Sequence, residues 1–315
     1  MADAWRQSRR FVRESWYVVR REDRVTFPNV QQIRNSIAAL HSRASDLTQE
    51  KADTDAPIFL LSTGWRAGST LLQRILITDP RLFLWGEPMG EMTFVPRITE
   101  MLSQLATRDF TMWRSQPSLE NLFPTQLATS WIATLTPPSE DFRLALRGLF
   151  DRWLAEPTRR NGFARWGFKE VRLGASEASL LYWLYPGAKF VLLSRHPYDC
   201  YLSLSDANYH PLYYRYPNLR VDSAAGFSRH WNRIALSWSE LPEGFPCRHI
   251  KYEDVTSGRF DFSELGSWLG LQIREEIALP VVVGHTSKRP ELTWYERQII
   301  ARKAAPGMRS LGYAA

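Results

Sequence analysis

The sequence contains few cysteines, and this scarcity excludes two kinds of architecture. Its 315 residues include two cysteines, Cys200 and Cys247. Two thiols cannot form the disulfide framework of a small secreted domain, nor can they supply a cysteine-rich zinc site. We therefore expect both to be reduced core thiols.

Long apolar runs are also missing. No stretch approaches the roughly 20 apolar residues that a membrane-spanning helix needs. The first residues contain no apolar segment like that of a signal peptide, and the acidic residues among them are unusual for a transit peptide. The sequence thus predicts a cytoplasmic protein without a transmembrane segment.

Apolar, aromatic and basic residues are plentiful. Hydrophobic residues make up 44% of the chain, which has 13 Trp, 12 Tyr and 16 Phe. A chain of this length can bury a sizeable core as one large α/β domain or as two small ones. The net charge of +7 favours anionic partners. Such a partner could be a nucleic acid, an acidic membrane or a polyanionic small molecule, and net charge alone does not distinguish between them.

The stretch 58–76 has the pattern of a strand, a loop and a helix. A short apolar run ends at Gly64, and the apolar residues of 71–76 share one helical face. The loop between them, Gly-Trp-Arg-Ala-Gly-Ser-Thr, holds two glycines, a cation and two hydroxyls. Such a loop turns tightly and aims backbone N–H groups at an anion. It predicts a phosphate-binding loop, with a plain tight turn as the alternative.

This loop lacks the lysine of a nucleoside-triphosphate P-loop. That motif needs Gly-Lys-Ser/Thr, with the lysine on the β- and γ-phosphates. Here Ala67 and Gly68 precede Ser69, and the cation is Arg66. A P-loop kinase or other nucleotide-binding enzyme stays an alternative, which predicts Mg²⁺ dependence and binding of ATP or GTP.

Strand and helix patterns alternate along the rest of the chain. We predict further strands at 82–85, 165–170, 188–194 and 248–252, and helices at 178–185, from 197, around 227–238, at 262–271 and at 292–311. This alternation predicts an α/β fold with a parallel sheet flanked by helices on both faces. Residues 92–160 are predicted to form a helical insertion.

The first 55 residues differ from the rest. Residues 1–28 contain seven arginines and four acids, and residues 30–47 have the pattern of an amphipathic helix. We divide the chain into a basic helical N-terminal extension, 1–55, and an α/β domain, 56–315. The extension is interpreted either as a surface for a homodimer or another partner, or as a segment packed on the main domain.

Four segments resemble the sulfotransferases that use 3′-phosphoadenosine 5′-phosphosulfate (PAPS). Residues 65–72 resemble their 5′-phosphosulfate loop. Residues 193–197 resemble their 3′-phosphate motif, in which a serine follows the arginine by eight residues, as Ser203 follows Arg195. Residues 251–255 resemble their Tyr-Glu-Asp-Leu segment, and 311–313 their closing Leu-Gly-Tyr. The segments occur in the family's order, and the resemblance implies its P-loop-type α/β fold.

The resemblance also implies a donor site for PAPS. It places around the donor Trp65, Arg66, Ala67, Gly68, Ser69, Thr70, Arg195, Ser203 and Tyr252. The C-terminal Arg-Lys-Gly segment of the cytosolic members is absent, and Ser287 and Lys288 are expected to stand in for it. Arginines and hydroxyls suit two separate anionic groups.

Residues 84–88, Leu-Trp-Gly-Glu-Pro, resemble the turn that carries the glutamate base of carbohydrate and protein-tyrosine sulfotransferases. The resemblance therefore implies that Glu87 takes the proton of a hydroxyl on a sugar, a tyrosine or another alcohol. Lys169 and Arg66 would stabilise charge on the leaving group. A sulfuryl group carries one fewer negative charge than a phosphoryl group, so no metal is expected.

Each candidate also has a structural interpretation. Glu87 would be an acid at a helix N-terminus, Lys169 an ion-pair partner of Glu170, and Arg66 and Arg195 surface charges. Ser203 would simply lie in a helix and Tyr252 in the core. A non-enzymatic basic protein that binds nucleic acid or membrane stays a third alternative. That alternative gives Glu87 no role, so we predict that the protein has no nucleic-acid partner.

Overall fold

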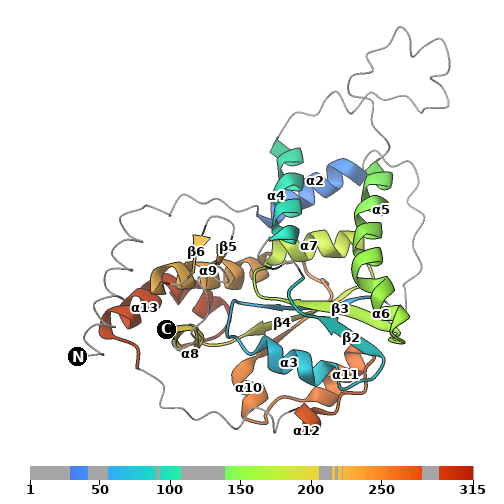
Figure 1. Ribbon diagram of the computed structural model, residues 1–315. Coiled ribbons are helices and arrows are strands. Elements are labelled where there is room, and N and C mark those ends of the chain that lie inside the picture. The colour runs from blue at the N-terminus through green and yellow to red at the C-terminus, as the bar shows by residue number, and fades with distance from the viewer. Residues whose placement is uncertain are drawn as a thin grey trace, which may run out of the picture.

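The computed structural model describes residues 29–41, 56–88, 90, 93–107, 139–205, 215–216, 219–221, 223–278 and 291–314. Its centre is a five-stranded sheet with the order β2-β3-β1-β4-β7 (Figure 1). Every neighbouring pair is parallel, which confirms the predicted α/β fold. The strands are β1 (Ile58–Ser62), β2 (Leu82–Trp85), β3 (Arg165–Glu170), β4 (Lys189–Ser194) and β7 (Cys247–Lys251).

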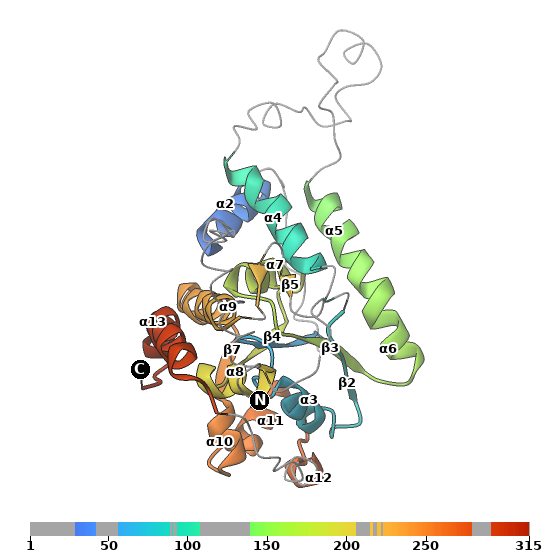
Figure 2. The ribbon, with the colours of Figure 1, turned by 60° about the vertical axis from the view of Figure 1, so that its left-hand side comes forward.

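Helices cover both faces of this sheet (Figures 1 and 2). One face carries α3 (Ser69–Leu76), α10 (Tyr252–Thr256), α11 (Phe262–Leu269) and α12 (Glu275–Ala278). The other carries α7 (Ala175–Leu184) and α9 (Ala224–Ser237). Beyond α7 lie α2 (Val30–His41), α4 (Phe94–Thr107) and α5 (Ser139–Phe150), which continues through a π-helical turn (Asp151–Ala155) into α6 (Glu156–Arg160). Beside α9 lie α8 (Pro197–Ser205) and α13 (Trp294–Ser310).

The central strand is buried on both faces because successive side chains point in opposite directions. Ile58 and Leu60 pack with the apolar residues of α3 and α11. Phe59 and Leu61 pack with those of α7 and α5. The Phe59 ring lies 4.8 Å from that of Phe168 on β3, between ring centroids. A continuous apolar run is what a strand in this position requires.

Each strand of the central sheet lies within one residue of its predicted bounds. The last strand ends at Lys251, one residue earlier than predicted, because Tyr252 already begins α10. α11 ends where Gly270 adopts a left-handed φ of 76°. The predicted helical insertion is helical in α4, α5 and α6, whereas residues 108–138 lie outside the described part. A short hairpin, β5 (Arg215–Tyr216) with β6 (Leu219–Arg220), was not predicted.

The N-terminal extension is described only in α2. Val30 and Ile33 are buried with residues of α4 and α7. Residues 1–28 and 42–55 lie outside the described residues, and with them most of the surface assigned to a partner. The boundary between 55 and 56 stays a prediction.

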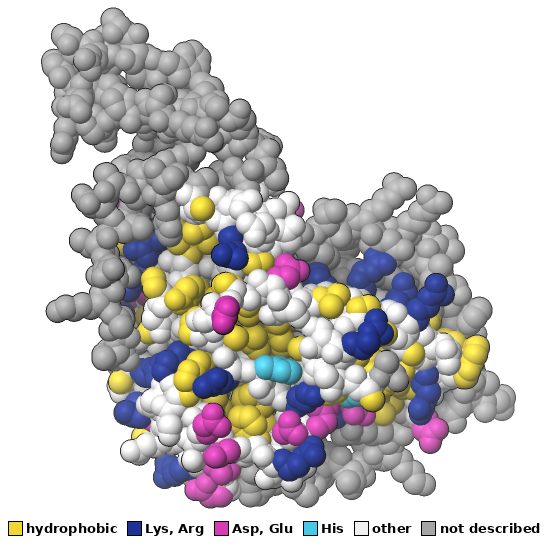
Figure 3. Space-filling view, turned by 180° about the vertical axis from the view of Figure 1, so that it is seen from behind, with side chains coloured by type: hydrophobic (Ala, Val, Ile, Leu, Met, Phe, Trp, Pro, Cys, Tyr) yellow, Lys and Arg dark blue, Asp and Glu magenta, His cyan; other side chains and the backbone are white. Residues whose placement is uncertain are grey.

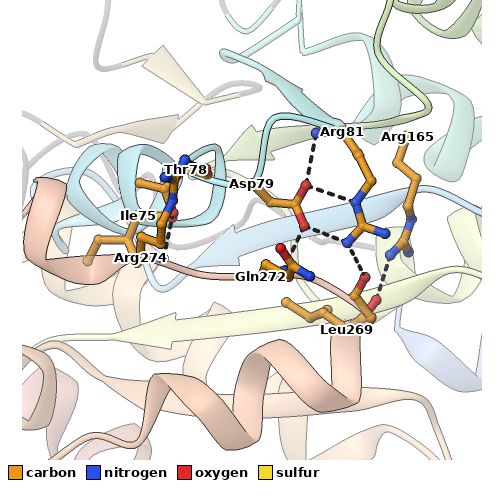
Figure 4. A network of polar contacts seen from close by, with 9 residues as sticks. Ile75, Thr78, Asp79, Arg81, Arg165, Leu269, Gln272 and Arg274 are labelled. Atoms are coloured by element: carbon orange, nitrogen blue, oxygen red, sulfur yellow. Dashed lines mark hydrogen bonds and ion pairs between the residues drawn. The ribbon is translucent and has the colours of Figure 1, made fainter.

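A polar network ties the turn after α3 to the segment after α11 (Figure 4). The Asp79 carboxylate accepts hydrogen bonds from Arg81 and from the backbone N–H of Gln272, at 2.7 Å. Arg81 also donates to the carbonyl of Gly270. Burial raises the pKa of Asp79, but these donors outweigh it and hold the pKa at about 2.

The surface carries charges of both signs. On the face shown in Figure 3, basic and acidic side chains are interspersed with hydrophobic ones. Within the described residues, no helix combines the length and apolar content that crossing a membrane requires. Of the two cysteines predicted to lie in the core, Cys200 is buried, whereas Cys247 is only partly buried.

Candidate active site

The predicted site residues that the structure describes gather at one edge of the sheet. The glycine loop follows β1, Glu87 follows β2, Arg195 follows β4, and Tyr252 follows β7. Lys169 lies near the end of β3. Because all five strands are parallel, these positions share the carboxyl edge, where open α/β sheets bind ligands.

The loop after β1 has an unusual backbone. Gly64, Arg66 and Gly68 have φ angles of 146°, 64° and 91°. A Cβ on Gly68 would lie 2.1 Å from the Tyr252 ring, so this position requires glycine. The Gly68 carbonyl accepts hydrogen bonds from the N–H groups of Leu71 and Leu72, which starts α3. The first N–H groups of a helix have no acceptor within it, so this end favours an anion.

Two predicted anion-binding segments meet at this loop. The Arg66 Nε donates to the Ser203 Oγ at 3.0 Å. Arg195 donates through Nη1 to the Arg66 carbonyl at 3.1 Å, and its guanidinium lies 4.4 Å from the centroid of the Tyr252 ring. The Ser203 hydroxyl is thus hydrogen-bonded to Arg66, whereas Arg195 bonds to the Arg66 carbonyl. The segments that resemble the 5′- and 3′-phosphate motifs are thus joined through hydrogen bonds.

Two loop residues support the site from inside. Trp65 is buried, with its ring 4.8 Å from that of His230 and 5.1 Å from the Arg172 guanidinium carbon. Ala67 is also buried. Both positions were predicted to bind the donor, and the structure places their side chains in the packing beneath the loop. Ser287 and Lys288 lie outside the described residues.

Glu87 lies in a cluster of two carboxylates and two cations. Its Oε1 is 2.6 Å from the Lys169 Nζ and its Oε2 is 2.8 Å from the Arg172 Nη1. Arg172 also binds Glu170, at 2.6 Å. Lys169 therefore pairs with Glu87, not with its neighbour Glu170 as the ion-pair interpretation supposed. Glu87 is the most exposed of the four: 25% of its side chain is accessible, against 9% for Lys169 and 2% for Arg172.

Burial and the charges within this cluster shift the pKa values of both glutamates. Burial raises the pKa of Glu87, but the nearby charges of Lys169 and Arg172 outweigh burial and hold the pKa below its usual value. Glu87 is therefore a carboxylate at neutral pH. Burial and the charge of Glu87 raise the pKa of Glu170, although Arg172 opposes the shift.

Arg172 is a functional candidate that the sequence analysis missed. It follows β3 at the same sheet edge, and its side chain is buried between Glu87, Glu170 and the Trp65 ring. A Cβ on Gly90 would lie 2.4 Å from its Nη1, so the chain after Glu87 fits closely around it. The signal was present, since Lys169, Glu170 and Arg172 crowd three charges at the end of a buried strand.

Histidines do not form a metal centre in the part of the chain that the structure describes. No group of three or more His, Cys, Asp or Glu side chains there could hold a metal ion. His230 is buried, and burial holds its pKa well below the usual value. It is a neutral packing partner of Trp65.

Comparison with known families shows which family the chain belongs to. Residues 57–273 match the model of the sulfotransferase family. Because the match spans more than half of the chain, the protein belongs to this family, whose enzymes transfer a sulfuryl group. A search of curated protein sequences finds no match.

Several solved structures are similar to this chain. A sulfotransferase from Alicyclobacillus acidocaldarius shares 14% identity with a TM-score of 0.41, over 81% of this chain and 94% of its own. A sulfotransferase domain from the Synechococcus PCC 7002 olefin synthase shares 20% identity with a TM-score of 0.41, over 86% of this chain and 100% of its own. A sulfotransferase from Mycobacterium avium shares 12% identity with a TM-score of 0.41, over 90% of this chain and 82% of its own.

Proposed function

We propose that the protein transfers the sulfuryl group of PAPS to a hydroxyl of a carbohydrate, a tyrosine or another alcohol. The observation that carries this proposal is the junction of two cationic anion-binding segments at the carboxyl edge of the sheet, beside a carboxylate. The glutamate of this junction, Glu87, supports a place near the branch of the family that uses a glutamate base.

The residues at the junction fit a donor with two separated anionic groups. The helix N-terminus at Ser69 and Thr70, with Arg66, would bind the phosphosulfate. Arg195 would bind the 3′-phosphate, and Ser203 would hold Arg66 toward the donor through the hydrogen bond already present. Tyr252, whose ring stacks on Arg195, would contact the adenosine portion.

Glu87 would act as the general base. Its ionised carboxylate would accept the proton of the acceptor hydroxyl as that oxygen bonds to sulfur and the bond from sulfur to the bridging phosphate oxygen breaks. Lys169 and Arg66 would stabilise the negative charge that moves onto the leaving phosphate. The products are a sulfate ester and adenosine 3′,5′-bisphosphate.

The packing around Gly68 weighs against a kinase. In a nucleoside-triphosphate P-loop the residue before the hydroxyl is a lysine. Here that residue is Gly68, and the Tyr252 ring occupies the space where a side chain would begin. The basic binding-protein alternative gives no role to the buried cluster around Glu87.

A transfer assay tests the proposal. The purified chain is incubated with ³⁵S-labelled PAPS and panels of sugars, tyrosine peptides and simple alcohols, in the presence of a metal chelator. We expect label in a product that carries a sulfate ester. Transfer of label from γ-³²P-ATP in Mg²⁺, with none from PAPS, would support the kinase instead.

A further inference from the structure

Tyr313 lies close to the end of the chain and joins two elements of the site edge. Its hydroxyl is 2.8 Å from the Ser194 Oγ, at the end of β4. It also donates to the Glu253 Oε2, on α10, at 3.0 Å. The Lys251 Nζ donates to the Gly312 carbonyl at 2.8 Å and lies 4.7 Å from the centroid of the Tyr313 ring. The segment after α13 is therefore docked by several contacts.

Glu253 connects Tyr313 to the donor site through hydrogen bonds. Its other oxygen, Oε1, accepts a hydrogen bond from the backbone N–H of His196 at 2.8 Å. That N–H belongs to the peptide group that follows Arg195. The carbonyl of the same peptide group accepts a hydrogen bond from the Trp231 Nε1 at 3.1 Å. Both sides of the peptide after Arg195 are thus held by side chains.

The orientation of this peptide matters because Arg195 links the two halves of the site. Its guanidinium reaches the Arg66 carbonyl in the glycine loop and stacks on Tyr252. Tyr252 is the neighbour of Glu253 on the short helix α10. A shift of the Glu253 side chain would therefore displace the backbone of Arg195 and move its guanidinium relative to the Tyr252 ring.

We propose that Tyr313 is a positioning residue for the donor site, which fixes Glu253 and, through it, Arg195. This inference rests on the proposed function, in which Arg195 binds the 3′-phosphate. It makes tight donor binding depend on a residue that follows the last helix, far in sequence from both anion-binding segments.

Calorimetric titration with two nucleotides tests this role. Adenosine 3′,5′-bisphosphate has the 3′-phosphate, and adenosine 5′-phosphate does not. For Tyr313→Phe we expect binding of the bisphosphate to weaken about 5- to 20-fold, which is part of the value of a hydrogen bond to a charged group. Binding of the monophosphate should change less than about 2-fold. The affinity ratio, defined as the affinity for the bisphosphate divided by the affinity for the monophosphate, should therefore fall.

Tyr185→Phe is the matched control. The Tyr185 hydroxyl also makes two partly buried hydrogen bonds, to the Asp151 Oδ1 at 2.9 Å and to the Arg147 carbonyl at 3.2 Å, but neither leads to the donor site. This variant should lower thermal stability without changing the ratio. A loss of packing or stability alone therefore cannot imitate the expected result.

A second pair of variants keeps the test decisive if Tyr313→Phe does not fold. Glu253→Gln can still accept from His196 and hydrogen-bond the Tyr313 hydroxyl, so its ratio should stay near that of the wild type, whereas Glu253→Ala should lower it. An unchanged ratio in Glu253→Ala and Tyr313→Phe, or an equal loss for both nucleotides, would overturn the inference. A wild type that does not bind the bisphosphate would instead overturn the proposed donor, and the inference with it.

Discussion

At the scale of single residues, the state of Glu87 is the central feature of the site. Two cations lower its pKa, so it carries no proton at neutral pH and is ready to accept one. The same cations reduce its basicity, which is a cost for a general base. Its contacts also fix the carboxylate in one orientation while a quarter of the side chain faces solvent.

Replacement of Glu87 tests its proposed role in proton transfer. Glu87→Gln keeps the shape of the side chain but removes the charge that would accept the proton. We expect kcat to fall about 10²- to 10⁴-fold, the usual contribution of general acid–base catalysis, with the affinity for adenosine 3′,5′-bisphosphate nearly unchanged. Turnover is measured with any hydroxyl acceptor that the wild type sulfates. A variant that retains most of its kcat would remove Glu87 from the mechanism.

The pH dependence of turnover gives a second prediction about Glu87. Because its folded pKa lies below the usual value, the carboxylate form persists as the pH falls from neutral through the ordinary range of glutamate. We expect kcat to show no acid limb attributable to Glu87 between pH 7 and about pH 5. A limb centred near pH 6 that disappears in Glu87→Gln would contradict the ion pairs seen here.

Arg172 should be important for stability as well as for the site. Its loss leaves Glu170 buried beside Glu87 without their shared cation. We expect Arg172→Met to lower the free energy of unfolding by about 3–5 kcal/mol. In the double variant with Glu170→Gln the loss should be smaller, because the buried carboxylate is gone. Urea unfolding of the single and double variants measures the difference, and strictly additive losses would argue against the pair.

At the scale of elements, the glycine loop shows why backbone geometry decides the site. Gly68→Ala would bring a Cβ against the Tyr252 ring and strain a φ of 91°. We expect it to abolish measurable binding of adenosine 3′,5′-bisphosphate. Gly162→Ala is the control, because that glycine has a φ of 87° and no atom within 4 Å of the added Cβ. It should cost about 1–2 kcal/mol of stability and leave nucleotide affinity unchanged.

The sequence predicted elements better than it predicted contacts between them. The buried strands are short apolar runs bounded by breakers, so local pattern sufficed for their position. The contacts of Lys169 and Arg172 depend on which strands lie side by side, which the apolar pattern does not encode. The hydrogen bond between Tyr313 and Glu253 depends on how the segment after α13 packs against α10. The family resemblance included the segments that contain these two residues, but it did not indicate that the residues contact each other.

At the scale of the whole molecule, the network around Asp79 joins the turn after α3 to the segment after α11, which lie 193 residues apart in sequence (Figure 4). Its pKa falls from 3.8 to about 2 on folding. A carboxyl with a depressed folded pKa stabilises the native state above its unfolded pKa. This contribution is lost as the pH falls through the folded value, so the relevant window lies between about pH 4 and pH 2.

Asp79→Asn tests this contribution. Near neutral pH we expect it to lower the free energy of unfolding by about 1–3 kcal/mol, because the buried acceptor of the hydrogen bonds from Arg81 and Gln272 loses its charge. The difference from the wild type should narrow as the pH falls below about 4. Urea unfolding at neutral pH and at pH 3 measures it. Asp254→Asn removes an exposed ion pair with Arg259 and should change stability little; a similar loss in both would contradict the account.

The central claim is that two anion-binding segments form one donor site, and calorimetric titration of adenosine 3′,5′-bisphosphate tests it most directly. The titration uses wild type and Arg195→Ala without metal, with ATP as the comparison ligand. The account predicts micromolar binding by the wild type, loss of that binding in the variant, and far weaker binding of ATP. Absence of binding, or a preference for ATP that requires Mg²⁺, would contradict it.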